Sequence, residues 1–319
     1  MSWQPSASTS VLQQRAEIIN QIRQFFLKRG ILEVETPLLA KTGVTDPNIH
    51  CITAEFELLG TSQIETCYLQ TSPEYAMKRL LAAGSGSIFQ ICKAFRNGEI
   101  GRKHNPEFTM LEWYRIGFSY QDLMQEVDEL LQLLFNTGKA DRLSYQQSFI
   151  NYLGIDPLTA SLEILAQVAK LQGIIIKAEL TKDDWLNLLF SSLIEPKLGQ
   201  EKPIFIYNYP ASQAALAAIN QEDPRVAERF EAFYKGVELA NGWHELADAK
   251  DQRERFQTDL IIRNQKGFKA VPIDENLLAA LQSGLPDCSG VAMGLDRLFM
   301  LLFTKPTIQE VISFDYSRV

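Results

Sequence analysis

FRNGEIGRKHNPEFTMLEWY, residues 95–114, joins an apolar strand, a polar loop and a second strand. Residues 88–95 are apolar enough for a buried strand, and this strand ends next to Arg96. Beyond the loop, side chains of one face recur at every second position, as in a half-buried strand: Phe108, Met110, Glu112 and Tyr114. The stretch therefore predicts two strands joined by a polar loop.

The residue types of this hairpin suit a nucleotide. Arg96 offers a planar fork of donors for bidentate contact with phosphate, and Phe108 offers a face on which a base can stack. Glu112 and Tyr114 can anchor cationic or polar groups. The alternative is a charged hairpin with a half-buried face and no ligand.

A second stretch, residues 288–294, predicts a strand with one nearly bare face. Alternation places Gly290, Ala292 and Gly294 on that face, so that a ligand or another element can approach the backbone closely. Asp296 and Arg297 then open a helix, whose amino end and guanidinium both favour phosphate. This combination favours the ligand over simple packing.

Residues 238–245, ELANGWHE, set two carboxylates about a turn apart across an expected Asn-Gly turn. Glu238 and Glu245 would suit Mg²⁺, a hard cation that takes oxygen ligands and keeps water. The alternative is a solvated hairpin. We expect His244 to be a packing or surface residue. Residues 71–74, TSPE, begin a helix and are at least a capping motif.

The remaining pattern mixes helices and strands without strict alternation, which favours an α+β fold with a mainly antiparallel sheet flanked by helices. Helices are expected at residues 11–29, capped by Ser10 and stopped by Gly30, and at 73–81, 120–135 and 185–198. Strands are expected at 204–207, 230–240 and 288–294.

Composition is that of an ordinary globular protein, since 46% of the 319 residues are hydrophobic and 22% are charged. We expect a single domain over residues 1–319, with 1–10 flexible, no secretory signal and a soluble, cytoplasmic protein. The 4 cysteines and 3 histidines show no zinc or disulfide spacing. The net charge of −8 weighs against tRNA as a partner.

Three segments together resemble a known family. FRN followed by HNPEFTMLEWY is similar to motif 2 of the class II aminoacyl-tRNA synthetases, specifically of the lysyl-tRNA synthetase branch. GILEVETPLL, residues 30–39, is similar to motif 1, whose proline ends a helix-strand unit at the dimer interface. GVAMGLDRL, residues 290–298, is similar to motif 3. The resemblance implies a class II catalytic domain and a homodimer.

The resemblance also implies roles for individual residues. The first acid of an E-x-x-N-G-x-x-E run serves metal and ATP, and the second faces the substrate ammonium, so Glu238 and Glu245 are the candidate Mg²⁺ ligands. The candidate catalytic residues are Arg96, Arg297 and Glu238. Expected ATP contacts are Arg96, Asn97, Gly98, Glu99, Asn105, Phe108, Glu238, Leu239, Gly294 and Arg297. Expected substrate contacts are Ser72, Pro73, Glu74, Glu112, Tyr114, Glu245 and Ala292.

Two positions depart from the synthetase pattern. Motif 2 usually has a carboxylate two residues after its arginine, whereas this chain has Gly98 there and Glu99 next. Either Glu99 takes over that contact or the contact is absent. Lysyl-tRNA synthetases tend to have glycine at the position of Ala292, so an added methyl would narrow the pocket near the substrate α-carbon.

The expected activity follows from a further resemblance. Motif 1 begins at Gly30, which leaves no room ahead of it for an anticodon-binding domain. LQTSPEYAMKRLL, PASQAALA and PDCSGVAMG resemble stand-alone lysyl-tRNA synthetase paralogues that modify elongation factor P. These paralogues activate (R)-β-lysine with ATP and Mg²⁺ and transfer it to a lysine of elongation factor P. The alternatives are a truncated lysyl-tRNA synthetase that activates α-lysine for tRNA, and a non-catalytic paralogue.

Overall fold

The computed structural model describes residues 3–319, which fold into two compact units. Unit 1 contains the chain up to Phe118 together with Leu246–Val319, and unit 2 contains Ser119–Glu245. Each unit combines strands with helices, as expected for the α+β class. A single catalytic domain over the whole chain stays a prediction.

The main strands of unit 1 are antiparallel and carry the two most informative sequence stretches. Strand β5 (Ile88–Phe95) pairs with β6 (Glu107–Ile116), and β6 pairs with β11 (Cys288–Gly294). The short β1 (Leu32–Glu33) runs parallel to β5 at the edge. The bounds predicted for β5 and β11 are confirmed.

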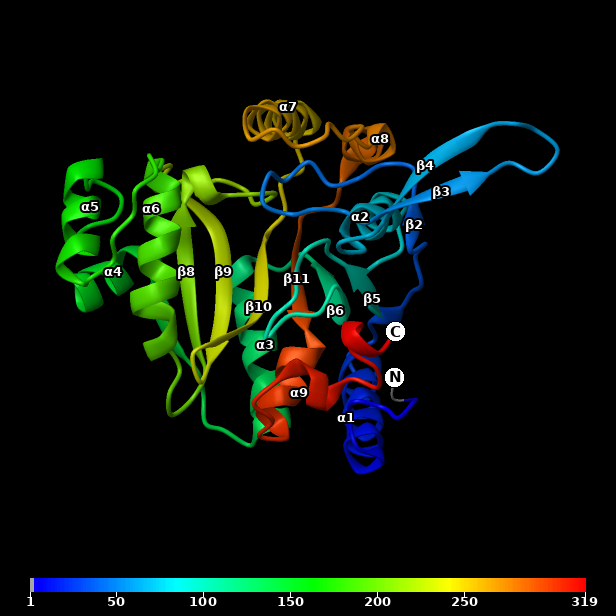
Figure 1. Cartoon of the computed structure of the whole chain (residues 1–319), viewed down its shortest axis with the longest axis horizontal. Coiled ribbons are helices and arrows are strands. Elements are labelled where there is room, and N and C mark those ends of the chain that lie inside the picture. Colours follow the sequence, from blue (N-terminus) through cyan, green and yellow to red (C-terminus); the bar gives the residue numbers. More distant parts are fainter. Residues whose placement is uncertain (1–2) are drawn as a thin grey trace. The chain divides into compact units, whose positions relative to one another are not determined.

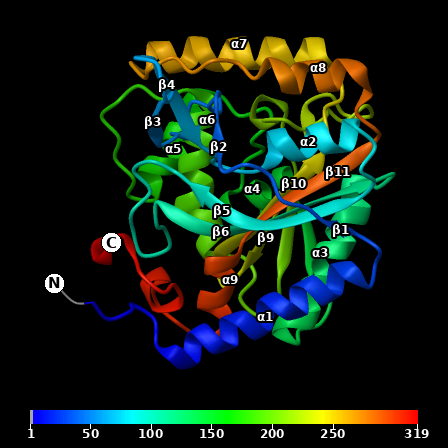
Figure 2. The ribbon, with the colours of Figure 1, turned by 90° about the vertical axis from the view of Figure 1, so that its right-hand side faces the viewer.

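Helices cover these strands at both ends of unit 1. Helix α1 (Thr9–Leu27) packs through Phe26, whose ring stacks on Phe89 of β5 with 4.7 Å between centroids. Figures 1 and 2 show α1 at one end of the unit and α7 (Ala249–Gln265) with α8 (Glu275–Gly284) at the opposite end. The other helices of the unit are α2 (Glu74–Ala82), which packs against α8, and α9 (Leu295–Leu302).

Unit 1 also holds a separate small sheet and two short helical turns. The small sheet has the strand order β2-β4-β3, with antiparallel pairing throughout. Its strands are β2 (Leu39–Ala40), β3 (Thr53–Glu57) and β4 (Ile64–Leu69), and the turns near the C-terminus are η4 (Ile308–Val311) and η5 (Tyr316–Arg318).

The first helix begins two residues earlier than predicted. Its N-cap is Ser8, whose side chain accepts from the amide of Val11, so the predicted Ser10 cap is wrong. The expected flexible segment 1–10 includes Met1 and Ser2, which lie outside the described residues. Farther along, the amides of Ser6 and Ala7 donate to the carbonyls of Ser313 and Ile312.

Unit 2 has its own four strands, in the order β10-β9-β8-β7. Strands β8 (Ile204–Pro210), β9 (Val226–Tyr234) and β10 (Val237–His244) are antiparallel, and β7 (Asp141–Ser144) is parallel to β8. Helices α4 (Tyr145–Leu153), α5 (Leu162–Leu171) and α6 (Lys182–Leu189) pack on one face of these strands around a core that includes Tyr145, Phe149, Leu165, Leu186 and Phe233.

Of the two helices predicted in unit 2, the first has the predicted bounds and the second is interrupted. Helix α3 (Tyr120–Phe135) has the predicted bounds. The helix expected at 185–198 begins at Lys182 and changes after Leu189 into a π-helical turn η1 (Phe190–Ile194) and a 3₁₀ turn η2 (Glu195–Lys197). The amphipathic pattern continued through these turns, but Pro196 lacks the amide needed to continue an α-helix.

The strand predicted at 230–240 is wrong, because a tight turn divides it. Lys235 and Gly236 both have positive φ, 54° and 66°, and connect β9 to β10. A Cβ at Gly236 would lie only 2.9 Å from the carbonyl oxygen of Pro196, so glycine is required there by both conformation and space. Across residues 3–319, none of the helices is long and apolar enough to span a membrane.

Candidate active site

Strand β6 brings the predicted ligand-facing side chains of unit 1 into rows with its two neighbours. Glu112 lies opposite Gln90 of β5 and Ala292 of β11. Tyr114, two residues on, lies opposite Gly290. Because paired residues of adjacent strands share a face, the period-two pattern of β6 and the bare face of β11 form one surface.

Glu112 is the centre of a short hydrogen-bonded chain on this surface. Its carboxylate is only 2% exposed and accepts from Tyr114 Oη at 2.7 Å and from Ser72 Oγ at 2.7 Å. Buried carboxylates need such donors, which hold the charged form in a fixed orientation. Ser72, Glu112, Tyr114 and Ala292, predicted as substrate contacts from three separate motifs, are therefore brought together.

The TSPE segment starts α2, but its capping differs from the prediction. The helix begins at Glu74, with Pro73 as the N-cap, so Pro73 is not its first residue. Ser72 Oγ accepts from the Glu74 amide at 3.0 Å while it donates to Glu112. One hydroxyl thus connects the helix start to the sheet. The side chain of Glu74 forms an ion pair with Lys78 one turn later, at 2.6 Å.

Arg96 stands at the end of β5 beside two of its predicted neighbours. Its guanidinium lies over the Phe108 ring, 5.2 Å from the centroid, and Nη1 is 3.7 Å from Glu99 Oε1. Its Nε is buried without a hydrogen-bond partner among residues 3–319. A buried donor of this kind is suited to a bound anion.

Glu99 is the carboxylate beside Arg96 in this loop, and whether it takes over the usual motif 2 contact stays a prediction. Gly98 has a φ of 82°, and a Cβ there would meet nothing within 4 Å. The glycine is needed for the turn rather than for space. Asn97 is exposed, and its backbone amide donates to the His50 carbonyl at 2.8 Å.

The side chain of Asn105 is engaged with the protein itself. Its Nδ2 donates to the Glu107 carbonyl at 2.7 Å, and its Oδ1 accepts from the Tyr316 amide at 3.0 Å. Together with His104 and C-terminal residues it lines a cavity of about 450 Å³. These contacts make Asn105 an anchor of the loop.

Gly294 lies at the end of β11 and is the N-cap of α9. A Cβ at this position would meet no heavy atom within 4 Å among the described residues, so no neighbouring element of residues 3–319 requires glycine here. Arg297, in the first turn of α9, reaches the motif 2 loop, with Nη2 at 2.5 Å from His104 Nε2. Open space, a helix amino end and a guanidinium thus coincide, as a phosphate site needs.

Sequence reasoning missed the partner of Asp296. This residue is 2% exposed, pairs with Arg15 of α1 at 2.6 Å, and accepts from the Thr109 amide at 2.6 Å. Its carboxylate therefore joins α1, β6 and α9. Arg15 lies in the predicted first helix, but it belongs to none of the motifs, so the sequence did not mark it as the partner of Asp296.

In unit 2, β10 passes straight through Asn241 and Gly242, so the predicted Asn-Gly turn is wrong. A bulge lies between Glu238 and Ala240: Glu238 pairs with Phe233 of β9, whereas Asn241 pairs with Glu231. Phe233 and Glu231 share a face, and therefore Glu238 and Asn241 also share it despite their odd spacing. Leu239, the intervening residue, is buried.

The same face continues to the second carboxylate. Trp243 pairs with Arg229 on this face, and Trp243 Nε1 donates to Glu245 Oε2 at 3.0 Å. Glu245 is only 5% exposed. Without the bulge, Glu238 and Glu245, seven positions apart, would alternate to opposite faces.

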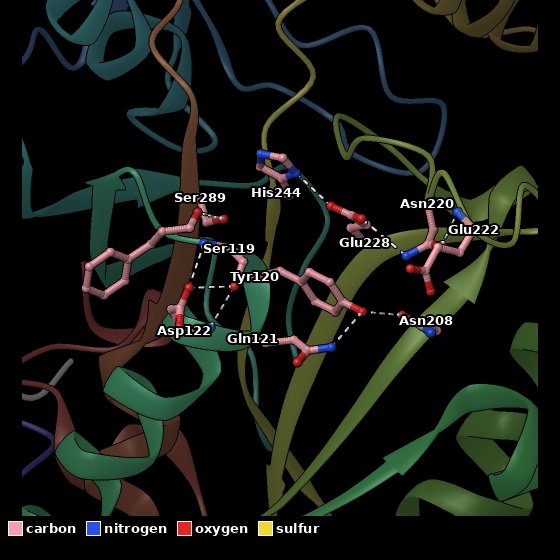
Figure 3. Close-up of polar contacts among 11 residues, drawn as sticks. Ser119, Tyr120, Gln121, Asp122, Asn208, Asn220, Glu222, Glu228, His244 and Ser289 are labelled. Atoms are coloured by element: carbon pink, nitrogen blue, oxygen red, sulfur yellow. Dashed lines mark hydrogen bonds and ion pairs between the residues drawn. The ribbon is translucent and has the colours of Figure 1, made fainter.

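His244 points to the other face. Its Nδ1 lies 2.6 Å from Glu228 Oε2, and Glu228 Oε1 accepts from Asn220 Nδ2 at 3.2 Å, as Figure 3 shows. Tyr120, drawn in the same view, donates to Asn208. This geometry agrees with a packing role for His244.

Glu231 and Arg229 were also missed by sequence reasoning. Arg229 donates to Asn241 Oδ1 at 3.1 Å and pairs with Glu231 at 2.5 Å, and Tyr209 donates to Glu231 at 2.7 Å. Burial raises the pKa of Glu231 to about 7; Arg229 opposes this rise and the charge of Glu238 adds to it.

The carboxylates available in the structure limit the kind of metal site that the protein can form. No group of three or more His, Cys, Asp or Glu is arranged to hold a metal ion within residues 3–319. Mg²⁺ commonly takes one or two carboxylates together with phosphate oxygens and water. Glu238 can supply one such carboxylate, whereas the two oxygens of Glu231 already accept from Arg229 and Tyr209.

Comparison with known proteins agrees with these features. Residues 1–318 match the family model described as tRNA synthetases class II (D, K and N). The chain is 55% identical to a protein of Pseudoalteromonas translucida (strain TAC 125) named elongation factor P--(R)-beta-lysine ligase, over 99% of this chain and 98% of the relative. It is 52% identical to a protein of the same name from Vibrio cholerae, again over 99% of this chain and 98% of the relative. The protein of Vibrio atlanticus (strain LGP32) is 51% identical over 99% of both chains. The chain therefore belongs to the class II tRNA synthetases of the D, K and N group.

Proposed function

We propose that this protein activates (R)-β-lysine with ATP as an adenylate and ligates it to a lysine side chain of elongation factor P. The names of relatives that match along nearly the whole chain support this activity. The structural observation that carries the proposal is the buried Glu112, held by Ser72 and Tyr114 and flanked by Ala292. A fixed carboxylate on a sheet surface suits an amino-acid ammonium.

The ATP site in this proposal lies on motifs 2 and 3 of unit 1. Arg96 contacts the phosphates through its buried Nε, and Phe108 stacks with the adenine. Gly294 leaves space for the nucleotide, and Arg297 contacts phosphate at the start of α9. Glu99 orients Arg96, while Asn97, Gly98 and Asn105 shape the loop.

The amino-acid pocket of unit 1 is formed by Ser72, Pro73, Glu74, Glu112, Tyr114 and Ala292, and Glu245 of unit 2 stays a predicted substrate contact. Glu112 and Glu245 are 2% and 5% exposed, and each accepts a hydrogen bond that orients it, from Ser72 and from Trp243 respectively. A buried, oriented carboxylate suits an amino group of the substrate. The methyl of Ala292 limits the room beside Glu112.

Mg²⁺ would be held by Glu238, with Leu239 contributing only backbone, and would neutralise charge on the triphosphate. The second predicted ligand, Glu245, would have to share its Oε2 with Trp243 Nε1, which donates to it. The residues of the chain supply position and charge. The substrate carboxylate attacks the α-phosphorus and pyrophosphate leaves, while Arg96 and Arg297 stabilise the phosphates.

Transfer then requires no protein nucleophile. The amine of the acceptor lysine, in its neutral form, attacks the adenylate carbonyl and AMP leaves. The proposal further includes one catalytic domain, a homodimer formed through motif 1, and a cytoplasmic location. The net charge of −8 favours a protein acceptor over tRNA.

Pyrophosphate exchange with (R)-β-lysine and α-lysine, measured side by side, tests the activation step. Exchange with (R)-β-lysine above that with α-lysine is expected. For the transfer step, enzyme, ATP, Mg²⁺ and radiolabelled β-lysine are incubated with elongation factor P or with total tRNA, and acid-stable label is counted. Label on tRNA alone would replace this proposal with the truncated-synthetase alternative.

A further inference from the structure

Lys78 is a buried cation next to the amino-acid pocket that no motif assigned. Its side chain is 1% exposed and its Nζ lies 2.6 Å from Glu74 Oε1, while the Glu74 side chain is 13% exposed. The two residues are one turn apart on α2, the spacing of an ordinary surface ion pair. Surface pairs of this kind contribute little, but a buried lysine needs its partner.

Glu74 is held at two points. Its backbone amide donates to Ser72 Oγ at 3.0 Å, and its carboxylate accepts from Lys78. Ser72 in turn donates to Glu112, which accepts from Tyr114. An unbroken series of contacts therefore runs from the buried ammonium to the carboxylate at the centre of the pocket.

The second oxygen of Glu74 remains open to a ligand. Oε1 accepts from Lys78, whereas Oε2 accepts no hydrogen bond within residues 3–319. A carboxylate whose rotamer is fixed by one cation can accept from a second cation without losing more conformational freedom. The lysine thus orients an acceptor that would otherwise be mobile.

Lys78 also balances charge around Ser72. Ser72 donates to the carboxylate of Glu112, and it accepts from the backbone amide of Glu74, whose carboxylate pairs with Lys78. With Lys78, the three side chains have two negative charges and one positive charge, which leaves one net negative charge. One substrate ammonium matches that charge.

We propose that Lys78 is a positioning residue of the amino-acid pocket, which holds Glu74 so that its Oε2 accepts from an ammonium of the diamino-acid substrate. This inference rests on the proposed function. The competing explanation is that the pair only anchors the first turns of α2. Loss of a positioning residue raises the KM for the amino acid. Loss of a residue that only anchors α2 lowers the stability of the protein and leaves this KM unchanged.

The test is pyrophosphate exchange in the full-length Lys78→Met, Lys78→Arg and Glu74→Gln variants. We expect each to raise the KM for β-lysine about tenfold or more, the scale of one charge-assisted hydrogen bond, and to leave the KM for ATP within about twofold. Lys250→Met is the matched control, because Lys250 and Glu254 form the same i,i+4 pair at 3.9 Å on the exposed face of α7. The control should leave both constants unchanged.

Circular dichroism and thermal unfolding establish which variants fold. A folded Lys78→Met protein with an unchanged KM for β-lysine would overturn the inference, as would a loss of kcat alone. Should Lys78→Met not fold, Lys78→Arg decides: a higher KM for the amino acid alone supports the inference, and an unchanged KM refutes it. Absence of exchange in the wild-type protein with either lysine would instead refute the proposed function, and the inference with it.

Discussion

Arg15 on α1 and Asp296 in the first turn of α9 form a nearly buried ion pair, with 2.6 Å between Arg15 Nη1 and Asp296 Oδ1. Arg15 also donates to Thr109 Oγ1 and to the Val311 carbonyl. One guanidinium therefore joins the first helix, the motif 2 strand and the C-terminal segment of unit 1.

Breaking this pair from one side should be costly. Arg15→Met leaves the buried Asp296 uncompensated, and we expect a loss of about 3 to 5 kcal/mol in the free energy of unfolding. Arg15→Met combined with Asp296→Leu should lose less than the sum of the single variants. Urea unfolding of all four proteins measures this coupling, and strictly additive losses would contradict it.

Arg96→Ala should abolish most adenylate formation while the protein stays folded. Loss of one preorganised charge contact costs roughly 10²-fold or more in rate. Glu238→Gln should have a similar effect if it holds Mg²⁺. Pyrophosphate exchange measures both, with Arg142→Ala, an exposed arginine of β7, as the control. Near-normal exchange in a folded Arg96→Ala protein would remove Arg96 from the site.

Ala292→Gly should shift amino-acid preference. Ala292 lies beside Glu112 in the strand register, so its methyl limits the pocket at that point. One such group in an apolar pocket is worth about 1 to 3 kcal/mol of discrimination, and use of α-lysine should improve relative to β-lysine. Ala54→Gly in β3 controls for the general cost of glycine in a strand. An unchanged ratio would mean that the methyl of Ala292 only packs.

Asp259 should make stability depend on pH. Burial raises the pKa of this α7 carboxyl to about 6, against the hydrogen bond from Thr45. A raised acid pKa means that the folded state binds the proton more tightly, so stability falls as pH rises from about 4 through about 6. Asp259→Asn keeps an acceptor for Thr45 without the charge. At pH 8 it should be more stable than wild type by about 1 kcal/mol after allowance for solvent screening.

Chemical unfolding at pH 5 and pH 8 checks the Asp259 prediction. The exposed Glu254 on the same helix provides the control, since Glu254→Gln should give the same small change at both pH values. A stability difference between wild type and Asp259→Asn that does not grow with pH would count against the buried-charge explanation.

Gly236→Ala should destabilise unit 2 by more than a positive φ alone explains. The added Cβ would lie 2.9 Å from the Pro196 carbonyl oxygen, whereas Gly173, with a φ of 78°, has nothing within 4 Å. We expect Gly173→Ala to cost about 1 kcal/mol and Gly236→Ala clearly more. Thermal unfolding compares them, and equal losses would show that the backbone near Pro196 relaxes.

Elements with strong periodicity were predicted closely from the sequence. The strands Ile88–Phe95 and Cys288–Gly294 and the helix Tyr120–Phe135 have the predicted bounds, because each is apolar or amphipathic along its whole length. The hairpin at Lys235 and Gly236 was missed because apolar residues continue on both sides of a two-residue turn. Local pattern alone did not mark that break.

The candidate site was predictable to the extent that its residues belong to contiguous motifs. Glu112 and Tyr114 lie on one face of β6 because the side chains of a strand alternate between its faces, and this spacing is visible in the sequence. The contacts of Asp296 with Arg15 and of Glu74 with buried Lys78 depend on tertiary packing, and no spacing rule expresses the first. The second has i,i+4 spacing, but its burial could not be read from the sequence.

The bulge at Leu239 has a consequence for how this segment can evolve. Side chains of a regular strand alternate between faces, and the bulge shifts this alternation by one residue. Glu238 and Glu245 therefore lie on the same face although they are seven positions apart. A single-residue insertion or deletion between Glu238 and Asn241 would reverse every side chain on one side of it. Lineages that preserve the chemistry must therefore preserve the length of this segment as strictly as its acids, even where the intervening residue types drift.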